Sequence, residues 1–288
     1  MQIIVSGLIF GCIYALVALG LVLIYKTTAV VNFAQGEMAM FTTFISYVLL
    51  TSYGISYIPA IILSLVFAVL FGLAVYLGLM KRVQNAPHLN QVVLTLGLFM
   101  VVNGVAGLIW GYQQKPYPTA IEGRPFQIGN VFISANEIFI VILTVILMLV
   151  FFLVFRYTKI GLAMRAASQD PMASELMGIK VTTVFMGTWI LGTVLGGVAG
   201  IMTAPLTFLS PNMMSEVLML AFAGAVLGGF VSLPGAVFGG FLVGVFENLI
   251  SYYISPEMKI VFVFLLIIVV LYARPQGLFG GRKLMKKV

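Results

Sequence analysis

Residue types that bind metals, form disulfides or carry out covalent catalysis are almost absent from this sequence. Its 288 residues include a single cysteine, Cys12, and a single histidine, His88. A disulfide within the chain is therefore excluded, and a metal site, which needs several ligands, is not predicted. The sequence also lacks a hydrolase triad pattern, a phosphate-binding glycine loop and a dinucleotide fingerprint. We therefore do not expect the chain to be an enzyme by itself.

Charged residues are equally scarce. Only 8% of the residues are charged, 62% are hydrophobic, and the mean hydropathy is +1.16. A soluble domain carries roughly 25% charged residues, so a lipid bilayer is the solvent that suits this chain. The net charge of +7 could indicate a nucleic-acid partner, but no basic run alternates with aromatic residues. Nucleic-acid binding is not predicted.

Long hydrophobic runs, in contrast, are abundant. Because a helix needs about 20 apolar residues to cross the hydrocarbon core, the sequence predicts an all-α polytopic membrane protein. Its predicted crossings are residues 3–25, 33–50, 58–79, 92–110, 138–155, 184–203 and 260–272. The apolar region 217–253 is broken by "SLPG" and supplies either two crossings hinged at Pro234 or a re-entrant pair. About seven to nine transmembrane helices are therefore expected.

The basic residues predict how these helices are oriented. Most Lys and Arg residues fall in alternate connections or in the C-terminal tail, which the positive-inside rule assigns to the cytoplasm. The N-terminus is then outside and the C-terminus cytoplasmic, and residues 1–288 form a single transmembrane domain. The residues assigned to the inside are Lys26, Lys81, Arg82, Arg156, Lys159, Arg165, Lys180, Arg274, Arg282, Lys283, Lys286 and Lys287.

Small residues recur at the spacing that allows helices to pack closely in lipid. Gly192, Gly196 and Gly200 form two overlapping Gly-x-x-x-Gly steps, and Gly240 and Gly244 form another. In a bilayer, close backbone approach drives helix association because hydrophobic burial between helices gains little. We expect this packing within the chain, with an interface between subunits as the alternative.

The segment 156–183 is the longest and most polar connection assigned to the inside. Two helix-forming stretches in it, "GLAMRAA" and "MASELMGI", flank Asp170 and Pro171, a pair that commonly starts a helix. Gly178 is placed to end the second helix. The segment is either a solvated amphipathic linker or a compact docking surface for a cytoplasmic partner.

Four stretches together resemble a known family. They are "RAASQDPMASELMGI", "NFAQGE", "AVLGGFVSLPGAVFGGFLVGVFENL" and "RPQGLFG", and the match runs in order over about residues 5–281. They are similar to the inner-membrane permeases of ABC importers, in the branch that includes branched-chain amino-acid permeases. The chain length suits the shorter of the two permeases in such systems.

The resemblance implies a set of partners and a location. We expect a prokaryotic cytoplasmic membrane, a second permease forming a heterodimer, two cytoplasmic ATPase subunits and an extracytoplasmic solute-binding protein. ATP and Mg²⁺ would bind the ATPase subunits, so no cofactor is expected on this chain. Segment 156–183 becomes the coupling loop, and the residues mapped to ATPase contact are Arg165, Ala166, Asp170, Ala173, Leu176 and Gly178.

The stretch "NFAQGE" places polar residues at the expected inner start of the second span. Asn32 as a helix N-cap, with Gln35 three residues later, has the form of a capping box. Glu37 in the first turn would complement the helix dipole. Alternatively, Gln35 and Glu37 line the inner pathway or contact the partner permease. Gln35 replaces the histidine usual in this family, so a titrating switch is not expected here.

Two further polar residues lie within predicted spans. Asn103 is expected to form an interhelical hydrogen bond, with pathway lining as the alternative. Glu247 lies towards the outside, where snorkelling or loop capping competes with a role as a gate. The "SLPG" break is either a tight turn between two helices or a pathway-lining break. The residues predicted for the pathway or a gate are Asn32, Gln35, Glu37, Asn103 and Glu247.

The resemblance, together with these features, implies the permease subunit of an ATP-driven importer that moves branched-chain amino acids by alternating access. One alternative keeps the family but changes the solute to urea, short amides or other amino acids. A stand-alone secondary transporter is a second alternative, although it would usually need buried charges to bind a coupling ion. A structural membrane subunit without a pathway is a third.

Overall fold

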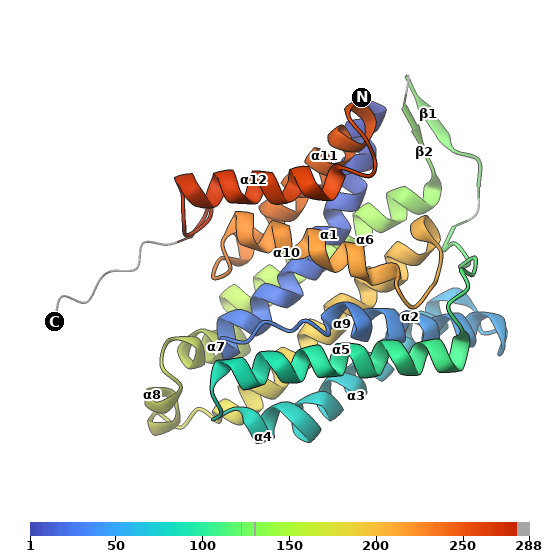
Figure 1. Cartoon of the computed structure of the whole chain (residues 1–288). Coiled ribbons are helices and arrows are strands. Elements are labelled where there is room, and N and C mark those ends of the chain that lie inside the picture. The colour runs from blue at the N-terminus through green and yellow to red at the C-terminus, as the bar shows by residue number, and fades with distance from the viewer. Residues whose placement is uncertain (122, 130, 281–288) are drawn as a thin grey trace.

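The structure, a computed structural model, describes residues 1–121, 123–129 and 131–280, so Arg282, Lys283, Lys286 and Lys287 of the expected basic tail lie outside the described residues. Figure 1 shows a bundle of long helices with a small β-hairpin at one end. The elements in order are α1 (Gln2–Thr28), α2 (Gln35–Thr51), α3 (Tyr57–Val75), the π-helical turn η1 (Tyr76–Met80), α4 (Lys81–Val83), α5 (His88–Trp110), β1 (Phe126–Ile128), β2 (Val131–Ile133), α6 (Ala135–Tyr157), α7 (Lys159–Gln169), α8 (Pro171–Leu176), α9 (Val181–Thr207), α10 (Met213–Gly228), α11 (Leu233–Tyr253) and α12 (Lys259–Ala273).

The described helices confirm an all-α polytopic membrane protein. Within the described ranges, six helical stretches are long and apolar enough to span a bilayer: α1, α3 through α4, α5, α6, α9 and α11. The helices α10 and α12 are apolar but shorter. The number of crossings and the side on which each end lies stay predictions.

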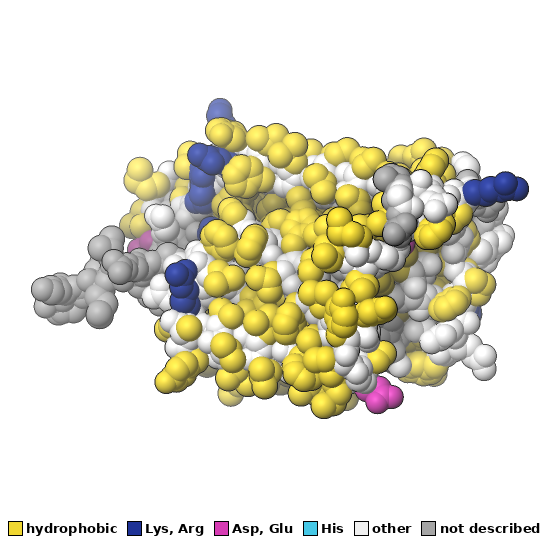
Figure 2. Space-filling view, turned by 90° about the horizontal axis from the view of Figure 1, so that it is seen from above, with side chains coloured by type: hydrophobic (Ala, Val, Ile, Leu, Met, Phe, Trp, Pro, Cys, Tyr) yellow, Lys and Arg dark blue, Asp and Glu magenta, His cyan; other side chains and the backbone are white. Residues whose placement is uncertain are grey.

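One end of the bundle collects the connections that the sequence assigned to the inside. Lys26, Arg156 and Arg165 line one pocket with the start of α11, and Lys26 lines another with Gln84 and Pro171. We call this the basic end. On the face shown in Figure 2, hydrophobic side chains cover the middle, and several Lys and Arg side chains gather towards the left margin.

The "SLPG" segment forms a tight turn at the basic end. The side chain of Ser232 caps α11 by accepting a hydrogen bond from the Gly235 amide (3.1 Å), and Pro234 occupies the first turn. The chain after α12 returns to this turn, where the amide of Leu278 donates to the carbonyl of Leu227 (2.8 Å). This geometry favours two helices hinged at Pro234 over a re-entrant pair entering from the outside.

The glycine steps pack helices of the same chain, as expected. A Cβ added at Gly244 would lie 2.5 Å from backbone atoms of Gly7 and Gly11 on α1, and one at Gly240 would lie 2.5 Å from the backbone of Ala15. This seam between α1 and α11 brings two helix backbones into direct contact. The series Gly192, Gly196 and Gly200 on α9 faces α1 and α2, where side chains such as Ile24 and Thr43 lie nearest to the added Cβ positions.

The helices form two halves of opposite direction. α1 and α9 each have 27 residues, and each is followed by a non-glycine residue with positive φ, Ala29 at 57° and Phe208 at 66°. A non-helical stretch then leads into a shorter helix, α2 or α10, whose first turn contains Glu37 or Glu216. α1 packs on α9, α10 and α11, while α9 packs on α2 and α3. The first turns of α2 and α10 meet inside the bundle.

The predicted coupling loop contains the two expected helices, α7 and α8. The Asp170 carboxylate accepts a hydrogen bond from the Ala173 amide (3.0 Å), and Pro171 fills the first turn of α8. Gly178 follows the helix with φ at 83°, a left-handed conformation that favours glycine. The capping predicted from the sequence at both ends of α8 is confirmed.

Candidate functional site

The predicted capping box at Asn32 and Gln35 is wrong. α2 begins at Gln35, its N-cap is Ala34, and no side chain caps it. Asn32 instead folds back locally, accepting a hydrogen bond from the Ala34 amide (3.1 Å). The Gln35 side chain donates to the carbonyl of Gly192 on α9 (3.2 Å), and its Oε1 is buried without a hydrogen-bond partner within the described chain. Tertiary packing against α9 has replaced the local cap.

The start of α2 lies within the bundle, which also corrects the predicted position of Asn32 at the inner end. Gln35 packs against Gly20, eight residues before the end of α1, or roughly 12 Å at 1.5 Å per residue. Residues 29–34 therefore lie between the two helices, in non-helical backbone inside the expected membrane. Such backbone is tolerated only where protein buries it or where it lines a cavity.

Glu37 and Asn103 come together in a polar cluster near this break. Asn103 Nδ2 on α5 lies 3.2 Å from Glu37 Oε2, from the Pro211 carbonyl and from Asn212 Oδ1. Tyr112 OH lies 3.5 Å from Asn103 Oδ1. Glu37 is only 1% exposed, whereas Asn103 is half-buried and Asn212 is exposed. The predicted interhelical hydrogen bond of Asn103 is thus confirmed, and the polar cluster reaches the surface of the bundle.

The polar cluster combines both kinds of hydrogen-bonding group. The Glu37 carboxylate, the Pro211 carbonyl and the Asn212 amide oxygen are acceptors, and the two asparagine side chains supply N–H donors. Acceptors of this kind suit an ammonium group, and amide donors suit a carboxylate. These are the types of group that pair with the two charges of a small zwitterion.

An apolar pocket of about 230 Å³ lies next to the same break. Val31, Asn32 and Phe33 form one wall, and the Phe33 ring stacks on Phe222 at 6.2 Å. The remaining lining residues are apolar side chains of α1, α10 and α12: Leu21, Leu218, Met219, Phe222 and Phe264. The non-helical chain therefore lies beside an apolar space as well as the polar cluster.

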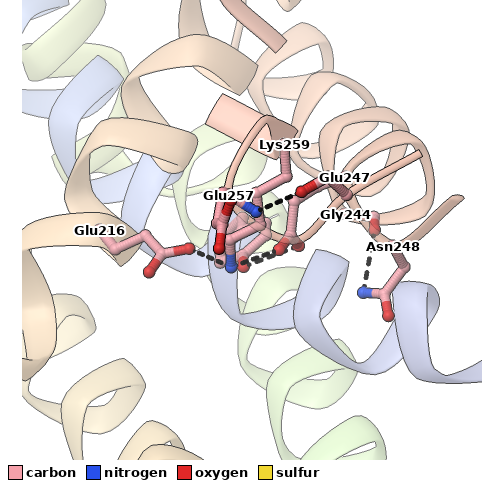
Figure 3. A network of polar contacts seen from close by, with 8 residues as sticks. Glu216, Gly244, Glu247, Asn248, Glu257 and Lys259 are labelled. Carbon is pink, nitrogen blue, oxygen red and sulfur yellow. Dashed lines mark hydrogen bonds and ion pairs between the residues drawn. The ribbon is translucent and has the colours of Figure 1, made fainter. Parts of the chain in front are cut away.

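Glu247 belongs to a separate group of charges, shown in Figure 3. Its Oε1 lies 2.9 Å from Lys259 Nζ, and its Oε2 accepts a hydrogen bond from Tyr14 OH (3.2 Å). Lys259 also pairs with Glu216 on α10. We call these residues the ion cluster. It joins α1, α10, α11 and α12, so Glu247 is neither snorkelling nor capping a loop.

The residues mapped to ATPase contact divide into two groups. Arg165 turns back towards α6, where its Nη2 donates to the Arg156 carbonyl (3.2 Å), and Ala166 is half-buried. Asp170, Ala173, Leu176 and Gly178 are exposed on or next to α8. Three large apolar side chains of this segment project into solvent, Met172 at 75%, Leu176 at 82% and Met177 at 83% exposure.

Sequence reasoning missed Asn212, Glu216 and Lys259. Asn212 and Glu216 lie one helical turn apart at the start of α10, the second of the two shorter helices. The structure shows what the two helix starts share: Glu37 and Glu216 are each the eighth residue after the positive-φ residue that follows a 27-residue helix. Recognising the inverted repeat would have directed attention to both helix starts.

Comparisons with known proteins agree with the resemblance seen in the sequence. The family model described as "Branched-chain amino acid transport system / permease component" matches residues 3–271. The permease protein LivH of the high-affinity branched-chain amino acid transport system of Escherichia coli K12 is 28% identical, covering 98% of this chain and 96% of its own length. The probable branched-chain amino acid transport permease LivH of Methanocaldococcus jannaschii is 30% identical, with 96% and 91% covered.

A solved structure supports the fold alone. A chain of PsaBC from Streptococcus pneumoniae, in complex with a Fab, superposes with a TM-score of 0.51 at 11% identity, covering 96% of this chain and 91% of its own. With relatives that are permeases of bacterial transport systems, and with at least six apolar helices in the described residues, this chain is a multi-pass inner-membrane protein.

Proposed function

Since the chain belongs to the family of permease components of branched-chain amino acid transport systems, we propose that it forms half of the pathway of an ATP-driven importer. The chain translocates its solute by alternating access and performs no chemistry on it. ATP and Mg²⁺ bind partner ATPase subunits, and no cofactor binds this chain. A second permease completes the pathway, and an extracytoplasmic binding protein delivers the solute.

The exposed helix α8 is the observation that carries this proposal. A helix of six residues has little stability by itself, yet α8 is capped at both ends and projects Met172, Leu176 and Met177 into solvent. Large apolar side chains gathered in an exposed position on one capped helix mark a protein interaction site. α8 therefore docks in a groove of an ATPase subunit, and α7 transmits the movement to α1 and α9, which it contacts.

The polar cluster and the apolar pocket support a branched-chain amino acid as the solute. Glu37, Asn103 and Asn212 offer acceptors and donors to the ammonium and carboxylate groups, and the 230 Å³ pocket beside Phe33 accommodates an aliphatic side chain. Contacts of this kind are weak enough to release the solute. Glu37 and Asn103 thus line the pathway, whereas Asn32 and Gln35 shape the break that forms its wall. Glu247 stabilises the ion cluster, which lies beside the pathway.

Co-purification with the ATPase subunits tests the docking helix. Leu176→Asp places a charge on the exposed face of α8 without entering the packed bundle, and we expect it to abolish ATPase retention. Leu89→Asp is the matched control, because Leu89 is 71% exposed on α5 and lies outside the coupling loop. Equal retention by both variants would rule out α8 as the docking surface.

Uptake into vesicles tests the transport function and separates the alternatives. The complete complex should take up leucine, isoleucine and valine only with ATP inside the compartment that holds the ATPases. Uptake of urea or short amides instead would keep the importer and change its solute. Uptake by this chain alone on an ion gradient would favour a secondary transporter. Assembly without uptake of any of these would favour a structural subunit.

A further inference from the structure

Within the described chain, a pocket at the basic end gathers three cationic side chains and no acidic one. It has a volume of about 410 Å³ and lies between the ends of α1 and α6, the middle of α7 and the start of α11. Its cationic residues are Lys26, Arg156 and Arg165, and none of the described residues that line it is Asp or Glu. We call it the cationic pocket. Its three positive charges compare with a net charge of +7 for the whole sequence.

Aromatic rings and a backbone carbonyl hold the cations in place. Lys26 Nζ lies 5.1 Å from the centroid of the Phe155 ring, and Arg165 Cζ lies 5.9 Å from the same centroid. Arg156 Cζ lies 5.7 Å from the ring centroid of Phe152. Cation–π contacts orient these groups, but they do not neutralise them. Three positive charges that share one pocket repel one another, and a bound anion would relieve that repulsion.

The start of α11 adds to the positive field. Ser232 and Leu233 line the cationic pocket, so the first turn of this 21-residue helix borders the same space. A helix N-terminus carries a partial positive charge and favours anions. The field of the helix therefore acts in the same direction as the three side chains.

The remaining wall of the cationic pocket is apolar and continues along the bundle. Phe152, Val231 and Phe279 line the pocket, and exposed apolar side chains extend from it along α6 at Leu149 and α11 at Phe238. The charges lie at helix ends, the level of the lipid headgroups, and the apolar faces lie at the level of the acyl chains. A ligand that uses both surfaces is amphipathic.

We propose that the cationic pocket binds the phosphate of an anionic phospholipid, with the acyl chains along the exposed faces of α6 and α11. A basic pocket between transmembrane helices recognises such headgroups through charge and hydrogen bonds. Arg165 then serves the lipid site rather than the ATPase surface. A bound lipid bridges α1, α6, α7 and α11 and steadies the base of the coupling loop. This assignment does not depend on the transported solute.

Native mass spectrometry of the purified chain in detergent tests this site. Phosphatidylglycerol is titrated against phosphatidylcholine, and we expect retention of the anionic lipid only. Lys26→Gln with Arg156→Gln should weaken phosphatidylglycerol binding about 30-fold, from a factor of about five for each cation removed. The control, Lys81→Gln with Arg82→Gln, removes the same charge from exposed positions outside the pocket and should weaken it less than about three-fold.

Three outcomes would overturn the proposal. Equal weakening in both double variants would mean general attraction to the positive surface. Displacement of the lipid by inorganic phosphate at equal concentration would make the pocket a site for free anions. If the double variant does not fold, Arg156→Gln alone replaces it in the binding experiment, because Arg156 is exposed and its substitution leaves the packed bundle unchanged. An unchanged affinity for phosphatidylglycerol in that variant would also refute the site. Thermal unfolding of each variant checks that the fold is retained.

Discussion

The seam between α1 and α11 allows a sharp prediction about stability. In Gly244→Ala, the new Cβ would lie 2.5 Å from Gly11 N, Gly11 Cα and Gly7 O. Ordinary contacts of this type begin near 3.4 Å, so the two helices must separate by about 1 Å. A gap of that size forfeits a quarter to a half of each dispersion contact along the seam. Because the obstructing atoms are backbone, no change of rotamer relieves the clash.

The expected loss of stability in Gly244→Ala follows from two opposing effects. Overpacking of this kind costs about 3 kcal/mol, at the upper end of the usual range. Replacing glycine by alanine within a helix recovers about 1 kcal/mol of helix propensity. We therefore expect Gly244→Ala to lower the free energy of unfolding by about 2 kcal/mol.

Reversible unfolding in mixed micelles, followed by circular dichroism, measures this difference. Gly104→Ala on α5 is the matched control, because a Cβ added there meets no atom within 4 Å. It gains the helix propensity without the clash and should be neutral or stabilising. If both variants unfold at the same denaturant concentration, the seam is not a backbone contact and the argument is refuted.

Three further predictions concern polar groups. Lys259→Met leaves the buried carboxylate of Glu247 without its cation and should lower the free energy of unfolding by about 3 kcal/mol. Adding Glu247→Gln should restore part of the lost stability. If the effects of the two substitutions are additive in a double-mutant cycle, the pairing is excluded. Asn103→Leu removes a donor to Glu37 inside the membrane and should cost about 1 kcal/mol in the same unfolding assay; an unchanged value would contradict the contact. Burial raises the pKa of the Tyr117 hydroxyl well above its ordinary value, so above about pH 10 the folded chain holds this proton while the unfolded chain releases it. The free energy of unfolding should therefore fall as the pH rises above about 10. Tyr117→Phe should make this fall with pH less steep, and an unchanged pH dependence would assign the effect to other groups.

The spans and the coupling loop could be predicted because their signals are local. The apolar run ending near Lys26 is long enough to cross a bilayer whatever its neighbours are. Asp170 and Gly178 act on backbone groups only a few residues away, so their positions already specify the two ends of α8. The ordering of basic residues likewise predicted a common end, where Lys26 and Arg156 now line one pocket.

The candidate site could be predicted only in part because its contacts are between distant residues. Asn32 and Gln35 have the spacing of a capping box, but the positive φ at Ala29 redirects the chain and Gln35 meets Gly192 instead. No local pattern reports that contact. Glu37 was identified by its cost within a membrane, yet its neighbour Asn212 follows a different long helix and was missed.

The burial of α1 has a consequence for biosynthesis. In the most apolar stretch of α1, 89% of the residues are buried. The helices that bury them, α9, α10 and α11, all come much later in the sequence. Until they emerge from the ribosome, α1 must reside in lipid with its glycine-rich face uncovered, which its high hydropathy allows. The helix at the centre of the finished protein is thus inserted well before the helices that enclose it. Contacts so distant in sequence form slowly, so the seam with α11 closes only after the second half has entered the bilayer.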